Sequence, residues 1–346
     1  MGEKRKKIKK IVLIILLIIL IFLFAGIALG YWYVMDKINK SEFIEIPEEE
    51  IEINEGVIEQ LNKYRNIVLL GIDARSQKQE LYESGTRSDC IIIASINEET
   101  KEVKLTSIYR DTYLKLTGSS FDKVTHAYYY GGPALVMSTL NTNLDLNITE
   151  FVAVNFEAVA DIVNEIGGIE LNITSAEIDY INEYIDATSK NTGIKSRHIT
   201  KSGKQTIDGV QAVAYARIRY TAGGDYKRTE RMRTVIEACL EKAKTLSLIQ
   251  LNSAADTVLS KVHRNISNGE ILSLLPKIAS YKITDSIGWP YEVKGSKING
   301  IYYSVPVNLE ALVEQLHKEL FGEEDYEVSD TVKSISNSII KKTGIK

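Results

Sequence analysis

The chain has 346 residues, with 42 Lys and Arg against 46 Asp and Glu, so its formal net charge is −4 at pH 7. This balance gives no electrostatic support to nucleic-acid binding, and we therefore exclude nucleic acid as a partner. The two cysteines, Cys90 and Cys239, lie in apolar runs, where they are more typical of small core residues than of a disulfide, a metal pair or a nucleophile.

The amino terminus has the pattern of a membrane anchor. Basic residues between Lys4 and Lys10 precede an uncharged run over residues 11–35, which is long enough to cross a bilayer as one helix. By the positive-inside rule, residues 1–10 form a cytoplasmic tail, and the chain from residue 36 onward is extracellular in a single-pass topology at the cell membrane. A cleaved signal peptide is the alternative, but its apolar region is usually shorter.

Residues 36–65 are polar and acidic, and we interpret them as an extracellular stalk. Two apolar runs then predict buried strands over residues 66–70 and 90–94, and residues 103–108 are expected to form a third strand. Charged residues stand at or just beyond the ends of these strands: Asp73 and Arg75, Arg87 and Asp89, Arg110 and Asp111. Strand ends are where α/β proteins build their sites, so these residues are candidates for one.

The remaining pattern alternates between helix and strand. We expect helices over residues 133–141 and 157–166, strands over 151–156 and 169–173, and a polar loop over 182–204. The part after residue 246 reads as mostly helical, with a strand at 302–307 and amphipathic helices at 310–320 and 329–341. The alternation predicts an α/β fold, a three-layer α/β/α sandwich with a mixed central sheet, preceded by one N-terminal transmembrane helix. Tyr128-Tyr129-Tyr130 fits packing better than a sugar platform, although the latter stays open.

Five arginines fall between Tyr215 and Arg233: Arg217, Arg219, Arg228, Arg231 and Arg233. The alternation over residues 213–220 predicts a strand, Gly223-Gly224 ends it, and Asp225 is a good N-cap for a following helix. Arg228 would lie on the apolar face of that helix, where a guanidinium is costly unless it is paired. Such a cluster indicates a site for phosphate or pyrophosphate; the alternative is internal salt bridges to Asp225, Glu230 and other acids.

Asp73 and Asp89 offer oxygen ligands on either side of one loop. Carboxylates of this kind suit Mg²⁺ or Mn²⁺, which often bind through one or two carboxylates plus substrate phosphates. The alternative is that each caps a turn or pairs with Arg75 or Arg87. Carboxylates for a metal beside arginines for phosphate oxygens are the recurring set for phosphoryl transfer.

The charged motifs, in their order along the chain, resemble the LytR-CpsA-Psr family of cell-wall glycopolymer ligases over about residues 66–243. They are Gly71-x-Asp73-x-Arg75, Arg87-Ser88-Asp89, Ser107 to Asp111, Gly131-Gly132, Gly167-Gly168-Ile169, Asp208-Gly209, Arg217-x-Arg219 and Asp225-x-x-Arg228-x-x-Arg231. Three positions depart from the family pattern: Ser88 stands for threonine, Tyr109 for proline and Met232 for glutamine. The first two keep the charged atoms, whereas the third removes a polar side chain near the site.

The resemblance implies a phosphotransferase that moves a glycopolymer from a polyprenyl-pyrophosphate carrier onto peptidoglycan, outside a Gram-positive membrane. Teichoic acids and capsular or secondary wall polysaccharides are the donors it suggests. Residues 66–346 would form the catalytic domain, with a motif-bearing core at 66–245 and a mostly helical part at 246–346. Helices at 133–140 and 157–166 would line a groove for the lipid tail.

Carried over residue by residue, the resemblance assigns Mg²⁺ to Asp73 and Asp89, with Asp89 also a candidate general base. Catalytic contacts to the pyrophosphate fall to Arg110, Arg217, Arg219 and Arg228. Further pyrophosphate-binding or supporting residues are Arg75, Arg87, Arg231, Asp111 and Asp225. Two other functions remain open: an anchored receptor or scaffold for polyprenyl phosphate or anionic wall polymer, and a lipid pyrophosphatase.

Overall fold

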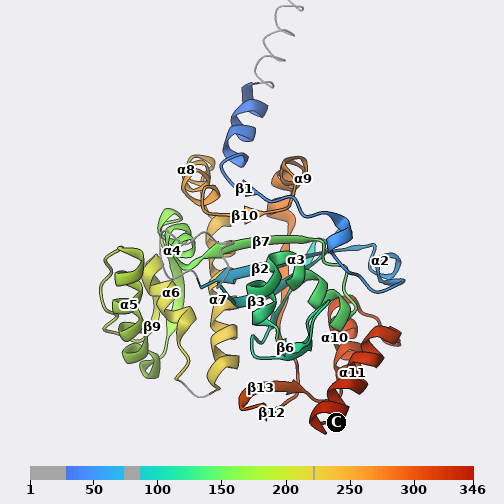
Figure 1. The fold of residues 1–346 in the computed structure, drawn as a ribbon. Coiled ribbons are helices and arrows are strands. Elements are labelled where there is room, and N and C mark those ends of the chain that lie inside the picture. Colours follow the sequence, from blue (N-terminus) through green and yellow to red (C-terminus); the bar gives the residue numbers. More distant parts are fainter. Residues whose placement is uncertain (1–28, 74–85, 221–222) are drawn as a thin grey trace, which may run out of the picture.

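A seven-stranded mixed sheet forms the centre of the computed structural model, which describes residues 29–73, 86–220 and 223–346 (Figure 1). β2 pairs antiparallel with β3 and parallel with β7, while β4 pairs antiparallel with β3 and parallel with β11. The strand order is β1 (Glu42–Phe43), β10 (His263–Arg264), β7 (Glu150–Asn155), β2 (Tyr64–Ile72), β3 (Ser88–Asn97), β4 (Glu102–Ile108) and β11 (Lys282–Trp289).

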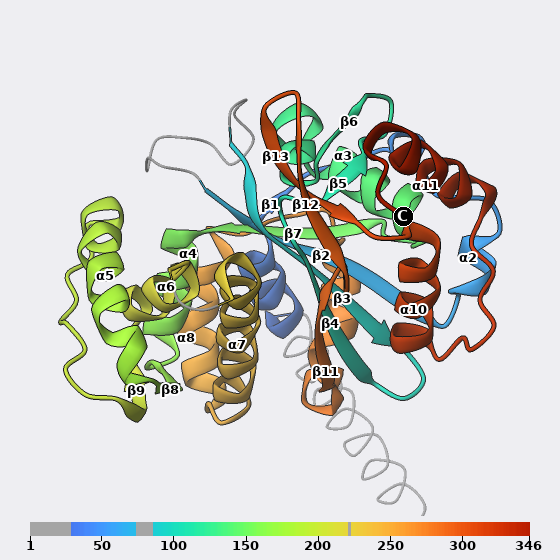
Figure 2. The ribbon, with the colours of Figure 1, turned by 90° about the horizontal axis from the view of Figure 1, so that it is seen from below.

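Helices cover both faces of this sheet, as the alternating side chains of β3 demonstrate. Ile91 and Ile93 belong to the large core under α3 (Thr125–Leu144), α10 (Leu309–Phe321) and α11 (Asp330–Thr343). Ile92 and Ala94 belong to a smaller cluster that Ile236 of α7 (Gly224–Lys244) covers on the opposite face. Figure 2 shows the two helical layers on either side of the sheet. The α/β sandwich with a mixed central sheet is therefore confirmed.

A second hydrophobic cluster joins the helices that carry the arginines. It is built from α4 (Phe156–Glu165), β8 (Ile169–Ile173), α5 (Ile178–Thr192), β9 (Gly203–Ile207), α6 (Gly209–Arg217), α7 and α8 (Leu248–Leu259). Gly209 begins α6 directly against α4, because a Cβ at this position would meet the Ala160 carbonyl oxygen at 1.8 Å. This close approach fixes the direction of α6, and with it the position of Arg217 at its end.

The strand expected over residues 213–220 is wrong, since α6 covers its first half. Asp208 and Gln211 form a capping box that starts a helix. The alanines between Gln211 and Arg217 also favour a helix. The alternation of side chains over residues 213–220 was therefore not sufficient evidence for a strand. Residues 182–204 are likewise not all loop, because α5 continues to Thr192. Tyr128 to Tyr130 lie within α3 rather than in a strand or loop.

The C-terminal part holds more strands than expected. β10 and β11 join the main sheet, and a hairpin of β12 (Val293–Ile298) and β13 (Ile301–Pro306) follows. The strand predicted at 302–307 lies in β13, and the helices predicted at 310–320 and 329–341 match α10 and α11.

The expected stalk at 36–65 packs against the rest of the chain in the structure. β1 pairs with β10, and Val57 of α2 (Val57–Gln60) and Leu61 are each 1% exposed within the main core. Residues 1–28, which hold the predicted cytoplasmic tail and most of the predicted span, lie outside the described residues; residues 29–38 are helical. Among the residues described, no helix combines the length and hydropathy needed to cross a bilayer.

His317 of α10 gives the fold an acid-sensitive point. Its ring is fully buried, stacks on Tyr326 with centroids 3.6 Å apart, and its Nε2 lies 2.9 Å from the Leu144 carbonyl oxygen. Burial lowers the pKa of His317 to about 4 from its usual 6.5. The unfolded chain therefore binds more protons between these pH values, so stability falls as pH drops through this window.

We predict that His317 contributes a loss of about 3 kcal/mol in unfolding free energy between pH 7 and pH 4. Chemical denaturation of the wild type and His317→Gln at both pH values measures it. The buried carboxylates contribute in both proteins, so the difference between the two isolates His317. Parallel pH profiles for both proteins would contradict the prediction.

Candidate functional site

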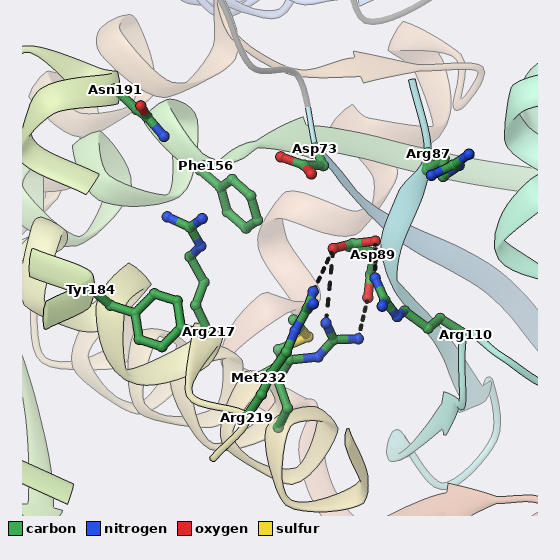
Figure 3. A pocket seen from close by; sticks show the side chains of 11 residues that line it. Asp73, Arg87, Asp89, Arg110, Phe156, Tyr184, Asn191, Arg217, Arg219 and Met232 are labelled. Carbon is green, nitrogen blue, oxygen red and sulfur yellow. Dashed lines mark hydrogen bonds and ion pairs between the residues drawn. The ribbon is translucent and has the colours of Figure 1, made fainter. Parts of the chain in front are cut away.

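A polar cavity of about 690 Å³ lies at one edge of the main sheet. The antiparallel pairing brings the end of β2, the start of β3 and the end of β4 to this edge, where Asp73, Asp89 and Arg110 follow or begin the strands. Of the six charged residues at the predicted strand ends, four line one cavity: Asp73, Arg87, Asp89 and Arg110. The cavity is lined by Asp73, Arg87, Asp89, Arg110, Phe156, Tyr184, Asn191, Arg217, Arg219, Arg228 and Met232 (Figure 3).

The Asp89 carboxylate is the meeting point of three guanidinium groups. Arg110 Nη1 lies 2.8 Å from Oδ1, Arg219 Nη2 lies 3.1 Å from Oδ2, and Arg228 Nη1 lies 3.8 Å from Oδ2. Burial would raise the pKa of Asp89, but the charges of these arginines outweigh it and hold that pKa below its usual value. Asp89 is therefore ionised and a weak base in this arrangement, which argues against its expected role as general base.

Arg228 is the most buried cation of the site, at 1% exposure. Its Nη2 lies 2.9 Å from Asp225 Oδ1, and the same atom donates to the Asp89 carbonyl oxygen over 3.4 Å. Burial lowers the pKa of Arg228, with Asp225 the largest opposing influence. Asp225 lies in the first turn of α7, whose N-cap is Gly223 rather than Asp225 as expected. Arg228 therefore forms an internal salt bridge with Asp225 and also lines the polar cavity, so the two alternatives considered for it from the sequence both apply.

Arg217 faces the cavity without a carboxylate among the described residues within ion-pair distance. Its Nη1 lies 3.1 Å from Thr188 Oγ1, and its guanidinium lies 5.0 Å from the ring centre of Phe156 and 5.4 Å from that of Tyr184. These contacts hold the side chain in place by cation–π attraction. Burial lowers the pKa of Arg217. Its charge is therefore available to a bound anion.

Asp73 and Arg87 lie across the cavity from the α6–α7 arginines (Figure 3). The Asp73 backbone N–H donates to the Arg87 carbonyl oxygen over 3.0 Å, which holds the two ends of their connecting loop together. Arg87 is exposed. Arg75, also expected to bind pyrophosphate, lies outside the described residues.

Arg231, expected as a pyrophosphate-binding or supporting residue, does not line the cavity. Its Nε lies 2.9 Å from Glu177 Oε1 and its Nη1 lies 3.3 Å from the Ile218 carbonyl oxygen, with the residue 3% exposed. It therefore fixes the chain between α6 and α7, where Arg219 follows Ile218. Asp111 also acts at a distance from the cavity, because Lys123 pairs with it at 2.8 Å and Arg110 Nε approaches it at 3.9 Å.

Four residues near the arginines were missing from the sequence prediction: Phe156, Tyr184, Thr188 and Asn191. Three of them lie on α5, which we expected to form a loop beyond residue 182. The signal was present, because the buried residues Ile181, Ile185, Thr188 and Thr192 of α5 repeat at helical spacing. This spacing was overlooked because the residues between them are mostly polar.

An apolar cavity of about 250 Å³ adjoins the polar one between the sheet and the helices α4, α6 and α7. Phe156 and Met232 line both cavities. The apolar lining also includes Leu69, Cys90, Val152, Val159, Ile162, Val213, Val235, Ile236 and Cys239. The expected groove thus involves the helix at 157–166, but the helix at 133–140 lies on the other face of the sheet (Figure 2).

The donor set for a metal is limited to two carboxylates. Within the described part of the chain, no group of three or more His, Cys, Asp and Glu side chains could hold an ion. Asp73 and Asp89 both line the polar cavity, and this oxygen-only pair fits an ion such as Mg²⁺ that completes its shell with phosphate oxygens and water. The arginine contacts of Asp89 would then have to pass in part to the phosphate.

We predict that Glu177→Gln lowers the unfolding free energy by about 3 kcal/mol, because the buried Arg231 loses its charged partner. Chemical denaturation measures the change. Glu170→Gln is the matched control, since its pair with Lys204 at 3.0 Å is largely exposed, and we expect a change below about 0.5 kcal/mol there. Equal effects of the two substitutions would contradict a structural role for the buried pair.

Comparisons with known proteins agree with this geometry. The sequence model of the LytR_cpsA_psr family matches residues 33–320, a range that includes every residue lining the polar cavity. The chain is 34% identical over 242 residues to a Bacillus subtilis protein named polyisoprenyl-teichoic acid–peptidoglycan teichoic acid transferase TagT, covering 69% of this chain and 70% of the relative.

Two solved structures are similar over most of the chain. One, described as TagT bound to LIIa-WTA, has a TM-score of 0.60 at 28% identity and covers 77% of this chain and 92% of that one. The other is the LytR-CPS2A-psr family protein YwtF (TagT) with bound octaprenyl pyrophosphate lipid. It has a TM-score of 0.56 at 26% identity and covers 76% of this chain and 91% of that one.

Proposed function

This chain belongs to the LytR-CpsA-Psr family, and we propose that it transfers a glycopolymer from a polyprenyl-pyrophosphate carrier onto peptidoglycan. A teichoic acid is the donor class that the names of its relatives support. Capsular or secondary wall polysaccharides are the alternative donors. The predicted anchor would keep this activity at the outer face of the cell membrane, where a carrier lipid is within reach.

One observation carries this proposal: a cavity rich in arginine adjoins a mostly apolar one, and the two share lining residues. Arg110, Arg217, Arg219 and Arg228 line the first, and Phe156 and Met232 form its border with the second. A ligand that satisfies both cavities must join a multiply charged anion to a long hydrocarbon. Polyprenyl pyrophosphate has this form, and one of the similar structures holds octaprenyl pyrophosphate.

The electrostatics of the polar cavity favour a pyrophosphate over a single carboxylate. At an effective dielectric constant near 20, each close arginine–oxyanion pair contributes about 4 kcal/mol before desolvation. Asp89 and Asp225 neutralise only part of the charge of Arg110, Arg219 and Arg228. Arg217 has no carboxylate within ion-pair distance among the described residues, and the charge of Asp73 offsets its burial only in part. A surplus of positive charge therefore remains for the substrate.

The protein's own residues can bind and orient the reacting phosphate. Arg219 is 40% exposed at its side chain and can turn from Asp89 toward a phosphate oxygen, while the buried Arg228 stays fixed. In the transfer, a hydroxyl oxygen of the acceptor bonds to phosphorus and the bond to the polyprenyl phosphate breaks. The hydroxyl proton leaves to a base or to solvent, and a phosphodiester remains. Arginines at fixed positions stabilise the charge that develops on the leaving group.

Asp73 and Asp89 would hold Mg²⁺ or Mn²⁺ in this reaction. Such an ion supplies charge neutralisation at the phosphate and at the leaving oxygen. The support for this assignment is the donor set alone, two carboxylates that line the same cavity as the arginines.

The decisive experiment is a transfer assay with the full-length chain in detergent, a labelled glycopolymer on polyprenyl pyrophosphate, and peptidoglycan. We predict magnesium-dependent label on peptidoglycan, with a loss of about 100-fold or more in Asp73→Ala, the scale of losing one charge-stabilising group. Asp325→Ala, at an exposed loop aspartate, is the control and should be fully active. Label released to water would identify a pyrophosphatase, and binding without turnover would identify a receptor. Full activity of Asp73→Ala would remove the metal assignment.

The apolar cavity allows a separate prediction about the lipid. Ile162→Trp should fill much of the 250 Å³ and raise the KM for a long polyprenyl donor about tenfold or more. A donor with a short alkyl pyrophosphate should be affected less, because its chain ends before Ile162. Ile162→Leu, which conserves volume, is the matched control. If Ile162→Trp raised the KM for the long donor and for the short donor by the same factor over wild type, the tail would bind elsewhere.

A further inference from the structure

A third cavity, of about 390 Å³, lies where α3 bends beside residues 44–50. We call it the kink cavity. It is lined by Ile44, Glu45, Ile46, Glu50, Tyr128, Tyr129, Tyr130, Gly131, Gly132, Pro133 and Ala134. None of these residues lines the polar or the apolar cavity. The lining holds two carboxylates, three tyrosines and no cation.

The backbone of α3 is opened at this point. Gly131 has φ −152° and ψ 22°, and Gly132 has φ 59° and ψ −154°, so neither follows helical geometry. Pro133 has no N–H to donate along the helix, so Gly131, Gly132 and Pro133 together give α3 a kink at the cavity.

Two aromatic rings stand open at the same bend. Tyr129 is 43% exposed and Tyr130 is 59% exposed. Their centroids are 5.2 Å apart and the rings are nearly perpendicular, at 89°, while Tyr130 also lies 6.3 Å from the ring of His126. Large exposed aromatic side chains that gather on a cavity mark binding surfaces. A sugar ring fits such a corner, since its C–H face packs on an aromatic ring and its hydroxyls reach polar groups at the rim.

Residues 44–50 are held firmly against α3 at the kink cavity. Ser138 Oγ donates to the Glu50 carbonyl oxygen over 3.2 Å and accepts from the Glu52 N–H over 3.0 Å. The N–H of Ile44 donates to the Arg264 carbonyl oxygen over 2.8 Å. The side chains of Glu45 and Glu50 therefore have a fixed backbone beneath them, and the cavity is part of the fold.

The start of α3 joins the kink cavity to the reaction site. The Thr125 N–H donates to the Arg110 carbonyl oxygen over 3.2 Å, and Thr125 Oγ1 donates to the Ser88 carbonyl oxygen over 2.8 Å. Tyr130 follows five residues later, about 7.5 Å along the helix. That separation is on the order of one sugar unit. A glycan in the kink cavity would thus extend toward Asp89 and Arg110.

The kink cavity and the apolar cavity lie on opposite faces of the sheet. α3 covers one face, while α4, α6 and α7 enclose the apolar cavity on the other (Figure 2). The polar cavity lies between them at the sheet edge. In-line displacement at phosphorus requires the attacking and leaving oxygens to lie on opposite sides. A leaving group on the α4–α6–α7 side therefore calls for an acceptor that enters from the α3 side.

We propose that the kink cavity binds the glycan strand of the acceptor, with Tyr129 and Tyr130 as its sugar-contacting residues. This rests on the proposed transfer to peptidoglycan. Glu45 and Glu50 add a selection by charge, because an anionic donor polymer such as a teichoic acid is repelled by carboxylates that a neutral sugar ring can use as hydrogen-bond acceptors. The donor and acceptor glycans are thus kept on separate paths.

The test measures binding directly, by calorimetry on the full-length chain in detergent. The probe is a soluble, uncharged tetrasaccharide of β-1,4-linked N-acetylglucosamine, which has the sugar rings of a peptidoglycan glycan strand without its carboxylates. We expect Tyr130→Ala to weaken its Kd about tenfold, or about 1.4 kcal/mol, and Tyr130→Phe to bind within twofold of wild type. Tyr302→Ala, at a tyrosine that is 51% exposed and lines none of the three cavities, is the matched control and should bind as wild type. In the transfer assay, Tyr130→Ala should raise the KM for peptidoglycan and leave the KM for the lipid donor unchanged.

Several outcomes would overturn the subsite. They are an unchanged Kd in Tyr130→Ala, an equal loss in Tyr302→Ala, or a rise in the donor KM in place of the acceptor KM. Competition by a soluble teichoic acid fragment that Tyr130→Ala abolishes would assign the cavity to the donor polymer instead. Binding of the tetrasaccharide does not depend on turnover. Tyr130-dependent binding without transfer would therefore retain the subsite and reject the transferase, and the reverse pattern would do the opposite.

Discussion

The contacts of Asp89 with three guanidinium groups are the interaction on which the site depends. Arg110 follows β4, Arg219 follows α6 and Arg228 belongs to α7, so one carboxylate joins three separate segments. Their mutual repulsion would otherwise separate these segments, and Arg228, at 1% exposure, could not remain charged at a tolerable free-energy cost without such partners. In the proposed reaction, phosphate oxygens of the substrate would share these guanidinium groups with Asp89.

The sheet separates the parts of the site that chemistry needs to keep apart. Its edge carries the charged cavity, one face borders the apolar cavity under α4, α6 and α7, and the other face supports α3 with its bend. The same alternation of side chains that sends Ile91 and Ile92 to different cores would therefore also divide the proposed lipid from the proposed acceptor glycan. A single layer of backbone thereby sets the geometry of displacement at phosphorus.

The parts of this arrangement that sequence predicts are those with a local pattern. β2 and β3 were predictable because a strand buried on both faces needs a continuous apolar run, and the charged ends of β2, β3 and β4 followed from the polar residues at the end of each strand. The strand predicted at residues 213–220 was wrong because small and larger residues alternate within α6 as well. The N-cap at Asp208 starts a helix there instead. Glu177 could not be found at all, since its partner Arg231 lies 54 residues away and a buried ion pair leaves no local pattern.

Met232 has a physical consequence at the border of the two cavities, where the family pattern has glutamine. Its thioether has almost no hydrogen-bonding demand, so it lines the polar and the apolar cavity without requiring a partner in either. An amide at this position would have extended the polar lining by one side chain toward the lipid. With methionine, the apolar surface reaches further toward the arginines, and Phe156 faces it under the guanidinium of Arg217. The change from charged to apolar lining therefore occurs within one side chain of Arg217, and the first carbons of a bound lipid would meet hydrocarbon and sulfur directly beyond the phosphate.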